Sequence, residues 1–253
     1  MKLLIDVGNT RIKWAWQQAG WLGEMKAALH RDQDFSRVLA DSLRAAIKPS
    51  SIVVANVAGI KAMVAIEQWA QTTWNIRPEF VASELFAHGV RNAYQVPAQL
   101  GVDRWMGLIA ARAMVSKPMC VVSCGTALTV DGLAGDGIHL GGVIAPGFNV
   151  MRGGLRAGTA LIQSQPHPED APLKNLILLA DNTDDAVAAG IGYALAGLVE
   201  RVFARIGQSQ AVAPNCVLTG GDAETLSAYL SIPHVCVADL VLRGLARVAA
   251  VPK

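Results

Sequence analysis

Residues 2–16 of the chain read KLLIDVGNTRIKWAW, and this stretch indicates how the fold begins. Residues 2–7 are a short, mostly apolar run of the kind that forms a buried strand. Gly8-Asn9-Thr10 follows as a turn of small residues, and residues 11–16 alternate polar and apolar side chains like a half-buried strand. The sequence therefore predicts strand, tight turn, strand, with Asp6 near the end of the first strand.

The predicted turn has the composition of a phosphate-binding loop. Glycine and asparagine tolerate a positive φ, so successive backbone N–H groups can point into one concavity, and Thr10 adds a hydroxyl. Asp6 would lie beside bound phosphates and hold Mg²⁺ directly or through water, while Lys13 would supply a positive charge. An ordinary hairpin turn with a surface aspartate explains the same residues about as well, because short glycine motifs often occur without a ligand.

Strands and helices alternate along the rest of the chain, which predicts an α/β fold. In the first half, strands are expected at residues 21–26, 51–55 and 79–82 and helices at 35–47 and 60–74. In the second half, strands are expected at 119–122, 127–133, 137–145, 216–219 and 234–237, and helices near 150–162 and at 183–206, 223–229 and 240–248. The two halves read as a duplication, with domains 1–116 and 117–253.

Composition narrows the class of protein. The chain has 253 residues, of which 52% are hydrophobic and 17% charged, and a net charge of +2, so it can bury a large core and has no basic surface typical of nucleic-acid binding. Asp6 interrupts the apolar start before a secretory signal could form, and the uncharged stretch 186–199 is too short to span a bilayer. We expect a cytoplasmic protein in which 186–199 is a buried helix and the four cysteines are reduced and mostly structural thiols.

Two further glycine-rich turns occur in the second half. Gly125-Thr126, with Thr129 and Asp131 beyond it, repeats the strand-turn-strand pattern, so two phosphate-binding turns are expected. Residues 219–221 (TGG) follow an apolar strand, at a place where a base or ribose can rest against bare backbone. Neither a GxxxxGK[ST] nor a GxGxxG motif occurs in the chain.

Residues 100–105 (LGVDRW), preceded by residues 92–94 (NAY), combine a base with an anion-binding group. If a helix begins here, Gly101 gives access to the backbone, Asp103 can accept a proton, and Arg104 offers two parallel donors to a carboxylate. Taken alone, a plain helix start explains these residues better, with Asp103 favoured by the helix dipole and Arg104 on the surface. Residues 141–147 (GGVIAPG) similarly read first as a strand ending in a turn and second as a close approach to a ligand.

Four of these elements stand in a fixed order: residues 6–10 (DVGNT), 101–104 (GVDR), 125–129 (GTALT) and 141–147. Together they resemble type III pantothenate kinase, from residue 1 to about Gly221. The resemblance implies the actin, Hsp70 and acetate or sugar kinase superfold, in which two RNase H-like domains flank an ATP cleft, and it implies a homodimer. It also implies ATP-dependent phosphorylation of pantothenate to 4′-phosphopantothenate, the first step of coenzyme A biosynthesis, with ATP, Mg²⁺ and a monovalent cation, K⁺ or NH₄⁺.

The resemblance assigns roles to individual positions. Asp103 would be the general base. The ATP and phosphate contacts would be Asp6, Val7, Gly8, Asn9, Thr10, Arg11, Ile12, Lys13 and Thr126. The pantothenate contacts would be Tyr94, Gly101, Val102, Asp103, Arg104 and, across the dimer interface, Thr183.

Ser123 departs from the family pattern, because the family usually has an aspartate there that ligates the monovalent cation. Losing a formal charge weakens cation binding, although the Ser123 hydroxyl and backbone carbonyl groups can still coordinate an ion. We expect the cation requirement to persist, and the sequence leaves the identity of the ligands open.

Two other functions remain open at this point. One is another small-molecule kinase of the same superfold, acting on a sugar, acetate or polyphosphate; the other is a nucleotide-dependent regulatory protein without a dedicated small substrate. Asp103 and Arg104 together favour a substrate with a hydroxyl and a carboxylate, and a regulatory protein would need no base.

Overall fold

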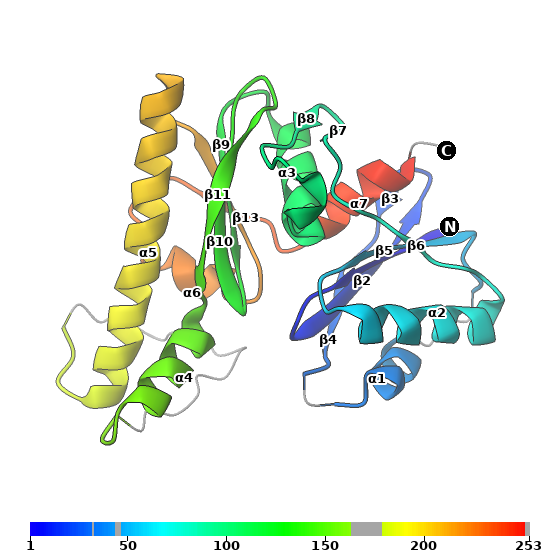
Figure 1. Cartoon of the computed structure of the whole chain (residues 1–253), viewed down its shortest axis with the longest axis horizontal. Helices are drawn as coiled ribbons and strands as arrows, with labels where there is room; N and C mark the ends of the chain where they lie inside the picture. The colour runs from blue at the N-terminus through cyan, green and yellow to red at the C-terminus, as the bar shows by residue number, and fades with distance from the viewer. Residues whose placement is uncertain (32, 44–46, 163–178, 251–253) are drawn as a thin grey trace. The chain divides into compact units, whose positions relative to one another are not determined.

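The computed structural model describes residues 1–31, 33–43, 47–162 and 179–250. By their contacts the residues form two compact units (Figure 1). The first unit comprises Met1–Ala110 and the C-terminal segment Asp239–Lys253, and the second comprises Ala111–Ala238. The expected domains, 1–116 and 117–253, differ from these units at the boundary and in the C-terminal segment.

A mixed sheet forms the centre of the first unit. Its strands are β1 (Lys2–Val7), β2 (Arg11–Gln18), β3 (Trp21–Leu22), β4 (Lys26–Leu29), β5 (Ser51–Asn56) and β6 (Glu79–Phe80). The order is β3-β2-β1-β5-β6, and β4 also pairs with β2. The hairpin β1–β2 is antiparallel, whereas β5 and β6 continue the sheet in parallel because helices connect them.

Alternating side chains of β1 face the two sides of this sheet, as the two-residue period of a strand requires. Leu3, Ile5 and Val7 lie in a core cluster with residues of α1 (Phe35–Ser42) and α2 (Ile60–Trp74). Lys2 donates a hydrogen bond to the Ala249 carbonyl of the last helix, α7 (Leu240–Ala250). Even-numbered residues of β1, Asp6 among them, therefore point away from the α1–α2 core.

The segment after β6 lies outside the main sheet. It contains the short hairpin β7 (Phe86–Ala87) and β8 (Val90–Arg91), the 3₁₀ turn η1 (Pro97–Gln99) and the start of α3 (Val102–Met114). The turn η1 has proline in its first position and ends at Gln99, and Leu100 and Gly101 connect it to α3.

The second unit repeats the strand order of the first. Its strands are β9 (Met119–Cys124), β10 (Ala127–Leu133), β11 (His139–Pro146), β12 (Asn215–Thr219) and β13 (Val235–Cys236), in the order β11-β10-β9-β12-β13. The hairpin β9–β10 is antiparallel, and β12 and β13 are parallel, as β5 and β6 are in the first unit. The expected duplication is therefore present in the topology.

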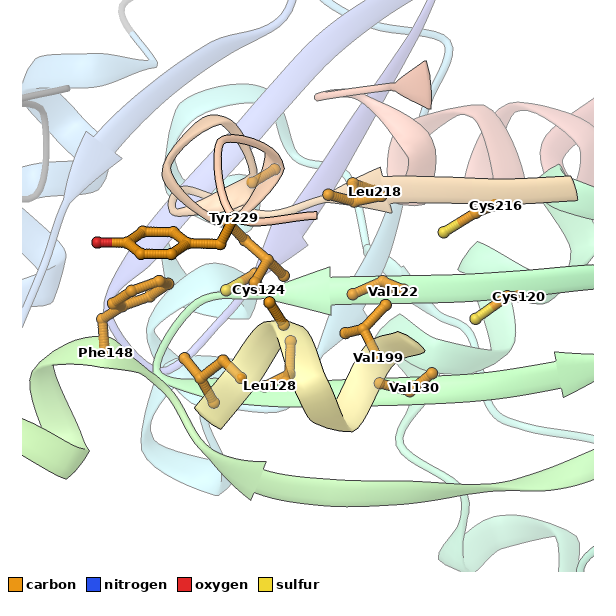
Figure 2. Close-up of a cluster of buried hydrophobic side chains, with 14 of the residues drawn as sticks. Cys120, Val122, Cys124, Leu128, Val130, Phe148, Val199, Cys216, Leu218 and Tyr229 are labelled. Atoms are coloured by element: carbon orange, nitrogen blue, oxygen red, sulfur yellow. The ribbon is translucent and has the colours of Figure 1, made fainter. Parts of the chain in front are cut away.

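In the described part of the second unit, the sheet is accompanied by the helices α4 (Phe148–Gly158), α5 (Thr183–Gln210) and α6 (Ala223–Ser227). Figure 2 shows their core, in which the thiols of Cys120, Cys124 and Cys216 pack among Val, Leu and aromatic side chains. Among the described residues, α5 is the one helix long and apolar enough to cross a membrane. Its side chains Leu195 and Val199 lie in this core, so it is a core helix, as expected for residues 186–199.

Several expected elements have different limits in the structure. The single strand expected at 21–26 is two short strands, because the chain turns at Gly23, whose N–H donates to the Trp16 carbonyl at 2.7 Å. The helix expected at 35–47 ends at Ser42, and residues 44–46 lie outside the described residues. The helix expected near 150–162 begins and ends earlier, and α5 extends to Gln210.

Candidate active site

The first turn (Gly8–Thr10) closes the β1–β2 hairpin, and its carbonyl groups are fixed from one side. The Gly8 N–H donates to the Arg11 carbonyl at 3.0 Å. The His30 ring binds the Gly8 carbonyl through Nε2 at 2.7 Å, and the His30 backbone N–H donates to the Thr10 carbonyl at 2.9 Å. His30, at the end of β4, thus orients a turn that lies more than twenty residues earlier in the sequence.

Asp6 is buried, with 7% of its surface exposed, so the alternative of a surface aspartate is wrong. Burial raises the pKa of its carboxyl to about 7, while Lys13 lowers this pKa and Asp103 raises it. Lys13 is the cross-strand partner of Asp6 in the hairpin. The structure therefore brings a carboxylate, an ammonium group and the candidate base into one electrostatic cluster within the first unit.

Asp103 and Arg104 open α3. The Arg104 backbone N–H donates to Asp103 Oδ1 at 2.8 Å, which fixes the carboxylate at the helix N-terminus. Asp103 is partly exposed, whereas Arg104 has only 7% of its surface exposed, so the expectation of a surface arginine from a plain helix start is wrong. A buried guanidinium next to an accessible carboxylate suits the recognition of a charged substrate.

Tyr94 holds the Arg104 side chain. Arg104 Nη1 donates to the Tyr94 hydroxyl at 3.1 Å, and the guanidinium carbon lies 5.8 Å from the centre of the Tyr94 ring. Gly101 lies against Asp103, because a Cβ at position 101 would be 2.7 Å from Asp103 Oδ1. Tyr94, Gly101, Asp103 and Arg104, all predicted substrate contacts, therefore form one cluster, and the adjacent Val102 is buried.

The second turn (Gly125–Thr126) connects β9 and β10 and is held by backbone packing. The Gly147 N–H donates to the Thr126 carbonyl at 2.9 Å, and a Cβ on Gly147 would lie 1.9 Å from the Gly125 carbonyl oxygen. Gly220, with φ +102°, approaches the preceding Cys124, where a Cβ would lie 2.0 Å from the carbonyl oxygen. No side chain larger than hydrogen fits at either position without movement.

The remaining predicted residues of the second unit have distinct environments. Ser123 is half-buried at the end of β9, and Thr183 is exposed as the first residue of α5. Asp131, grouped with the second turn on sequence grounds, is buried and forms a 2.9 Å pair with His139 Nε2. Asp131 is therefore paired with a residue of β11.

Sequence reasoning missed His30, and it singled out the motifs that contain Gly147 and Gly220 for ligand contact without predicting that these glycines hold the second turn. His30, Gly147 and Gly220 act through contacts with residues distant in sequence. Asn92 was noted only as a neighbour of Tyr94, yet its amide makes three hydrogen bonds. Trp105, which follows Arg104 in α3, is buried.

A family model described as type III pantothenate kinase matches residues 2–205. The chain belongs to this family. It is 41% identical to the type III pantothenate kinase of Nitrosococcus oceani, over 98% of this chain and 94% of that protein. It is also 41% identical to the type III pantothenate kinase of Azoarcus sp., over 99% of this chain and 91% of that protein. The family resemblance inferred from the four ordered elements is confirmed.

Solved structures show the fold that the family resemblance implied. A putative Baf family transcriptional activator from Campylobacter jejuni matches with a TM-score of 0.58 at 20% identity, over 98% of this chain and 97% of that one. A putative 2-dehydro-3-deoxygalactonokinase from Sinorhizobium meliloti matches with a TM-score of 0.57 at 14% identity, over the full length of both. The duplicated sheet order and these neighbours confirm the sugar kinase and actin-like fold class.

Proposed function

We propose that Asp103 is the general base of the reaction this family member carries out, the ATP-dependent phosphorylation of pantothenate in coenzyme A biosynthesis. The observation that carries the proposal is the cluster in the first unit. Asp103 stands at the start of α3 beside the buried Arg104, and its charge raises the pKa of Asp6 at the end of β1. A base, an anion-binding group and a phosphate turn thus occur together.

The proposed chemistry needs one proton acceptor. The Asp103 carboxylate takes the proton of the primary hydroxyl of pantothenate as that oxygen forms a bond to the γ-phosphorus of ATP. The bond from the γ-phosphorus to the bridging oxygen breaks, and ADP leaves with the electron pair. The products are ADP and 4′-phosphopantothenate.

Arg104 is proposed to bind the carboxylate of pantothenate through two parallel N–H donors. The Tyr94 hydroxyl fixes the guanidinium, and Gly101 leaves room beside Asp103. Val102 completes this part of the site through its backbone. Thr183, exposed at the start of α5, is proposed to contact pantothenate bound by a partner subunit.

ATP is proposed to bind residues 6–13 in the first unit and Thr126 in the second. The carboxylate of Asp6 suits Mg²⁺, because oxygen is the ligand this ion prefers and a cation relieves the cost of a buried charge. When bound with ATP, Mg²⁺ neutralises charge on the phosphate oxygens. Lys13, next to Asp6 in the hairpin, adds a positive charge toward the same phosphates.

A monovalent cation, K⁺ or NH₄⁺, is proposed to remain necessary for activity. Ser123 supplies a hydroxyl without formal charge, which fits such an ion less well than a carboxylate would. We therefore propose that backbone carbonyl groups near Ser123 share its coordination, with weaker binding than in relatives that have aspartate.

The protein is proposed to be a cytoplasmic homodimer. Large apolar side chains are exposed on β11, α4 and α5 of the second unit, among them Ile144, Val150, Leu155 and Tyr193. Exposed apolar side chains gathered on neighbouring elements are typical of a surface that a partner covers. The exposed Thr183 lies on the last of these elements, where a dimer would use it.

The deciding experiment measures ATP consumption by the purified chain with Mg²⁺ and pantothenate, with and without K⁺ or NH₄⁺. Turnover that requires both pantothenate and the cation supports the proposed reaction and its cation requirement. Turnover without the cation would show that Ser123 marks a cation-independent enzyme. ATP hydrolysis that ignores pantothenate would favour a nucleotide-dependent regulatory protein or another kinase of the fold.

Asp103→Asn tests the base directly, because the amide keeps the size of the side chain and removes the proton acceptor. We expect kcat to fall by about 10²- to 10⁴-fold while the dissociation constant of ATP stays unchanged. Asp136→Asn, at an exposed turn before β11, is the matched control. Unchanged turnover in the Asp103 variant would remove this residue from its proposed role.

A further inference from the structure

Residues 84–99 form a loop that is held by hydrogen bonds, one between the residues that flank it and several made by Asn92 within it. Ser83, which is buried, donates from Oγ to the Leu100 carbonyl at 2.8 Å, so the two ends of the loop meet just before Gly101. Within the loop the regular structure is limited to the two-residue strands β7 and β8 and one 3₁₀ turn. Such short elements contribute little rigidity, and the loop conformation depends on side-chain hydrogen bonds.

Asn92 makes these bonds. Its Nδ2 donates to the carbonyl oxygens of Glu84 at 3.2 Å and Pro97 at 3.4 Å, and its Oδ1 accepts from the Tyr94 N–H at 3.0 Å. Its backbone N–H donates to the Leu85 carbonyl at 2.9 Å. Asn92 has only 5% of its surface exposed, so water cannot easily replace these partners.

These hydrogen bonds connect Asn92 with the residues proposed to bind pantothenate. Asn92 fixes the backbone of Tyr94, the Tyr94 hydroxyl accepts from Arg104 Nη1, and the ring lies beside the guanidinium. A guanidinium binds a carboxylate through two parallel bonds only when its plane has the right orientation. Asn92 is thus linked to Arg104 through one intermediate residue, Tyr94.

We propose that Asn92 is a positioning residue that sets the preference of this enzyme for a substrate bearing a carboxylate. The inference rests on the proposed function of Arg104 as the carboxylate-binding group. Asparagine suits the position because one short side chain must donate twice and accept once. Aspartate has the same size but two acceptor oxygens, which would face the carbonyl groups of Glu84 and Pro97.

The test compares wild type with Asn92→Asp in the full chain, using pantothenate and pantothenol, the analogue with CH₂OH in place of the carboxylate. We expect the KM for pantothenate to rise roughly tenfold, about the effect of losing a hydrogen bond to a charged group, with the KM for ATP unchanged. The inhibition constant of pantothenol, which lacks the carboxylate, should not change. Asn215→Asp, the same chemical change at an exposed site on β12, should leave all three constants as in wild type.

A second variant keeps the inference testable if Asn92→Asp folds poorly. Tyr94→Phe removes only the hydroxyl that accepts from Arg104, and it should also raise the KM for pantothenate more than the inhibition constant of pantothenol. Equal weakening of pantothenate and pantothenol in both variants would show a merely structural role and overturn the proposal.

Arg104→Gln separates failure of this inference from failure of the proposed function. If Arg104→Gln abolishes the preference for pantothenate over pantothenol and Asn92→Asp and Tyr94→Phe do not, Arg104 binds the carboxylate and only the positioning role is wrong. If Arg104→Gln leaves that preference intact, the carboxylate is bound elsewhere, and the proposed role of Arg104 fails with the inference built on it.

Discussion

The two phosphate-turn candidates occupy equivalent places in the two sheets, yet different kinds of contact hold them in position. The first turn, between β1 and β2, is oriented by hydrogen bonds from the His30 ring and backbone to its carbonyl groups. The second turn, between β9 and β10, is held by close packing of Gly147 and Gly220. Each of these glycines lies so near a backbone carbonyl oxygen of the turn, or of the residue before it, that a Cβ would not fit. A duplicated topology therefore preserves the turn while the supporting contacts diverge.

The strand residues before the turns differ in the same way. Asp6 and its cross-strand partner Lys13 place opposite charges at the first turn, whereas the corresponding Ser123 and Thr129 place two hydroxyl groups at the second. A buried charge costs more than a buried hydroxyl unless a partner or a metal compensates for it. The stability of the first turn should therefore depend on pH and on bound cations. The stability of the second turn should depend on how closely its backbone can pack.

The largest expected effect is on the pH dependence of stability in protein without Mg²⁺ or nucleotide. The pKa of Asp6 rises from 3.8 to about 7 on folding. Between these values the unfolded chain loses the Asp6 proton while the folded chain keeps it, so raising the pH lowers the free energy of unfolding. The full difference corresponds to about 4 kcal/mol at pH 8 relative to pH 4.

Asp6→Asn removes this contribution, because the amide does not titrate. Urea unfolding at several pH values between 4 and 8 should show a smaller loss of stability with rising pH in the variant than in wild type. The surface variant Asp136→Asn is the control and should follow wild type. Identical slopes for wild type and the Asp6 variant would mean that the Asp6 carboxyl keeps its ordinary pKa.

The next effect concerns the second turn, where shape dominates. Gly147→Ala and Gly220→Ala each place a Cβ within about 2 Å of a backbone carbonyl oxygen, and position 220 also has φ +102°. We expect each variant to lose roughly 2–4 kcal/mol of stability through overpacking and backbone strain. Urea unfolding at one pH measures this loss.

Gly221→Ala is the matched control, since it adds the same atom one residue from Gly220 with nothing within 4 Å. It should change the free energy of unfolding little. If the Gly220 and Gly221 variants were equally stable, the close packing against Cys124 would not hold the second turn, and the contrast between the two turns would disappear.

Much of the fold could be predicted from the sequence, because periodic apolar patterns report which side of an element is buried. The helix at 60–74 and the strand at 127–133 have the predicted limits in the structure. The short strands β7 and β8 escaped prediction, since two residues cannot show a period. The return of α7 to the first unit also escaped, because it depends on contacts such as Gln17 Nε2 with the Ala246 carbonyl.

The residues of the candidate site also divide into those that the sequence could indicate and those that depend on contacts with distant parts of the chain. Residues proposed to carry chemistry in short motifs, such as Asp6, Asp103 and Arg104, could be named from their spacing and family resemblance. The burial of Arg104 could not, because it depends on Tyr94 and the loop around it. Residues such as His30 act on backbone groups far away in sequence, and no local pattern marks them.

The smallest expected effect tests the polar support of the first turn. The peptide between Gly8 and Asn9 is planar and trans, so fixing the Gly8 carbonyl toward His30 points the Asn9 N–H the opposite way, where a phosphate can accept it. His30→Ala frees this peptide, and the KM for ATP should rise about threefold to tenfold, the effect of one hydrogen bond. The KM for pantothenate should not change, because the loop held by Asn92 does not depend on His30. His30→Gln, which can still donate to the Gly8 carbonyl, should recover part of the ATP affinity. An alanine variant with the ATP affinity of wild type would show that the first turn, like the second, is held by its backbone alone.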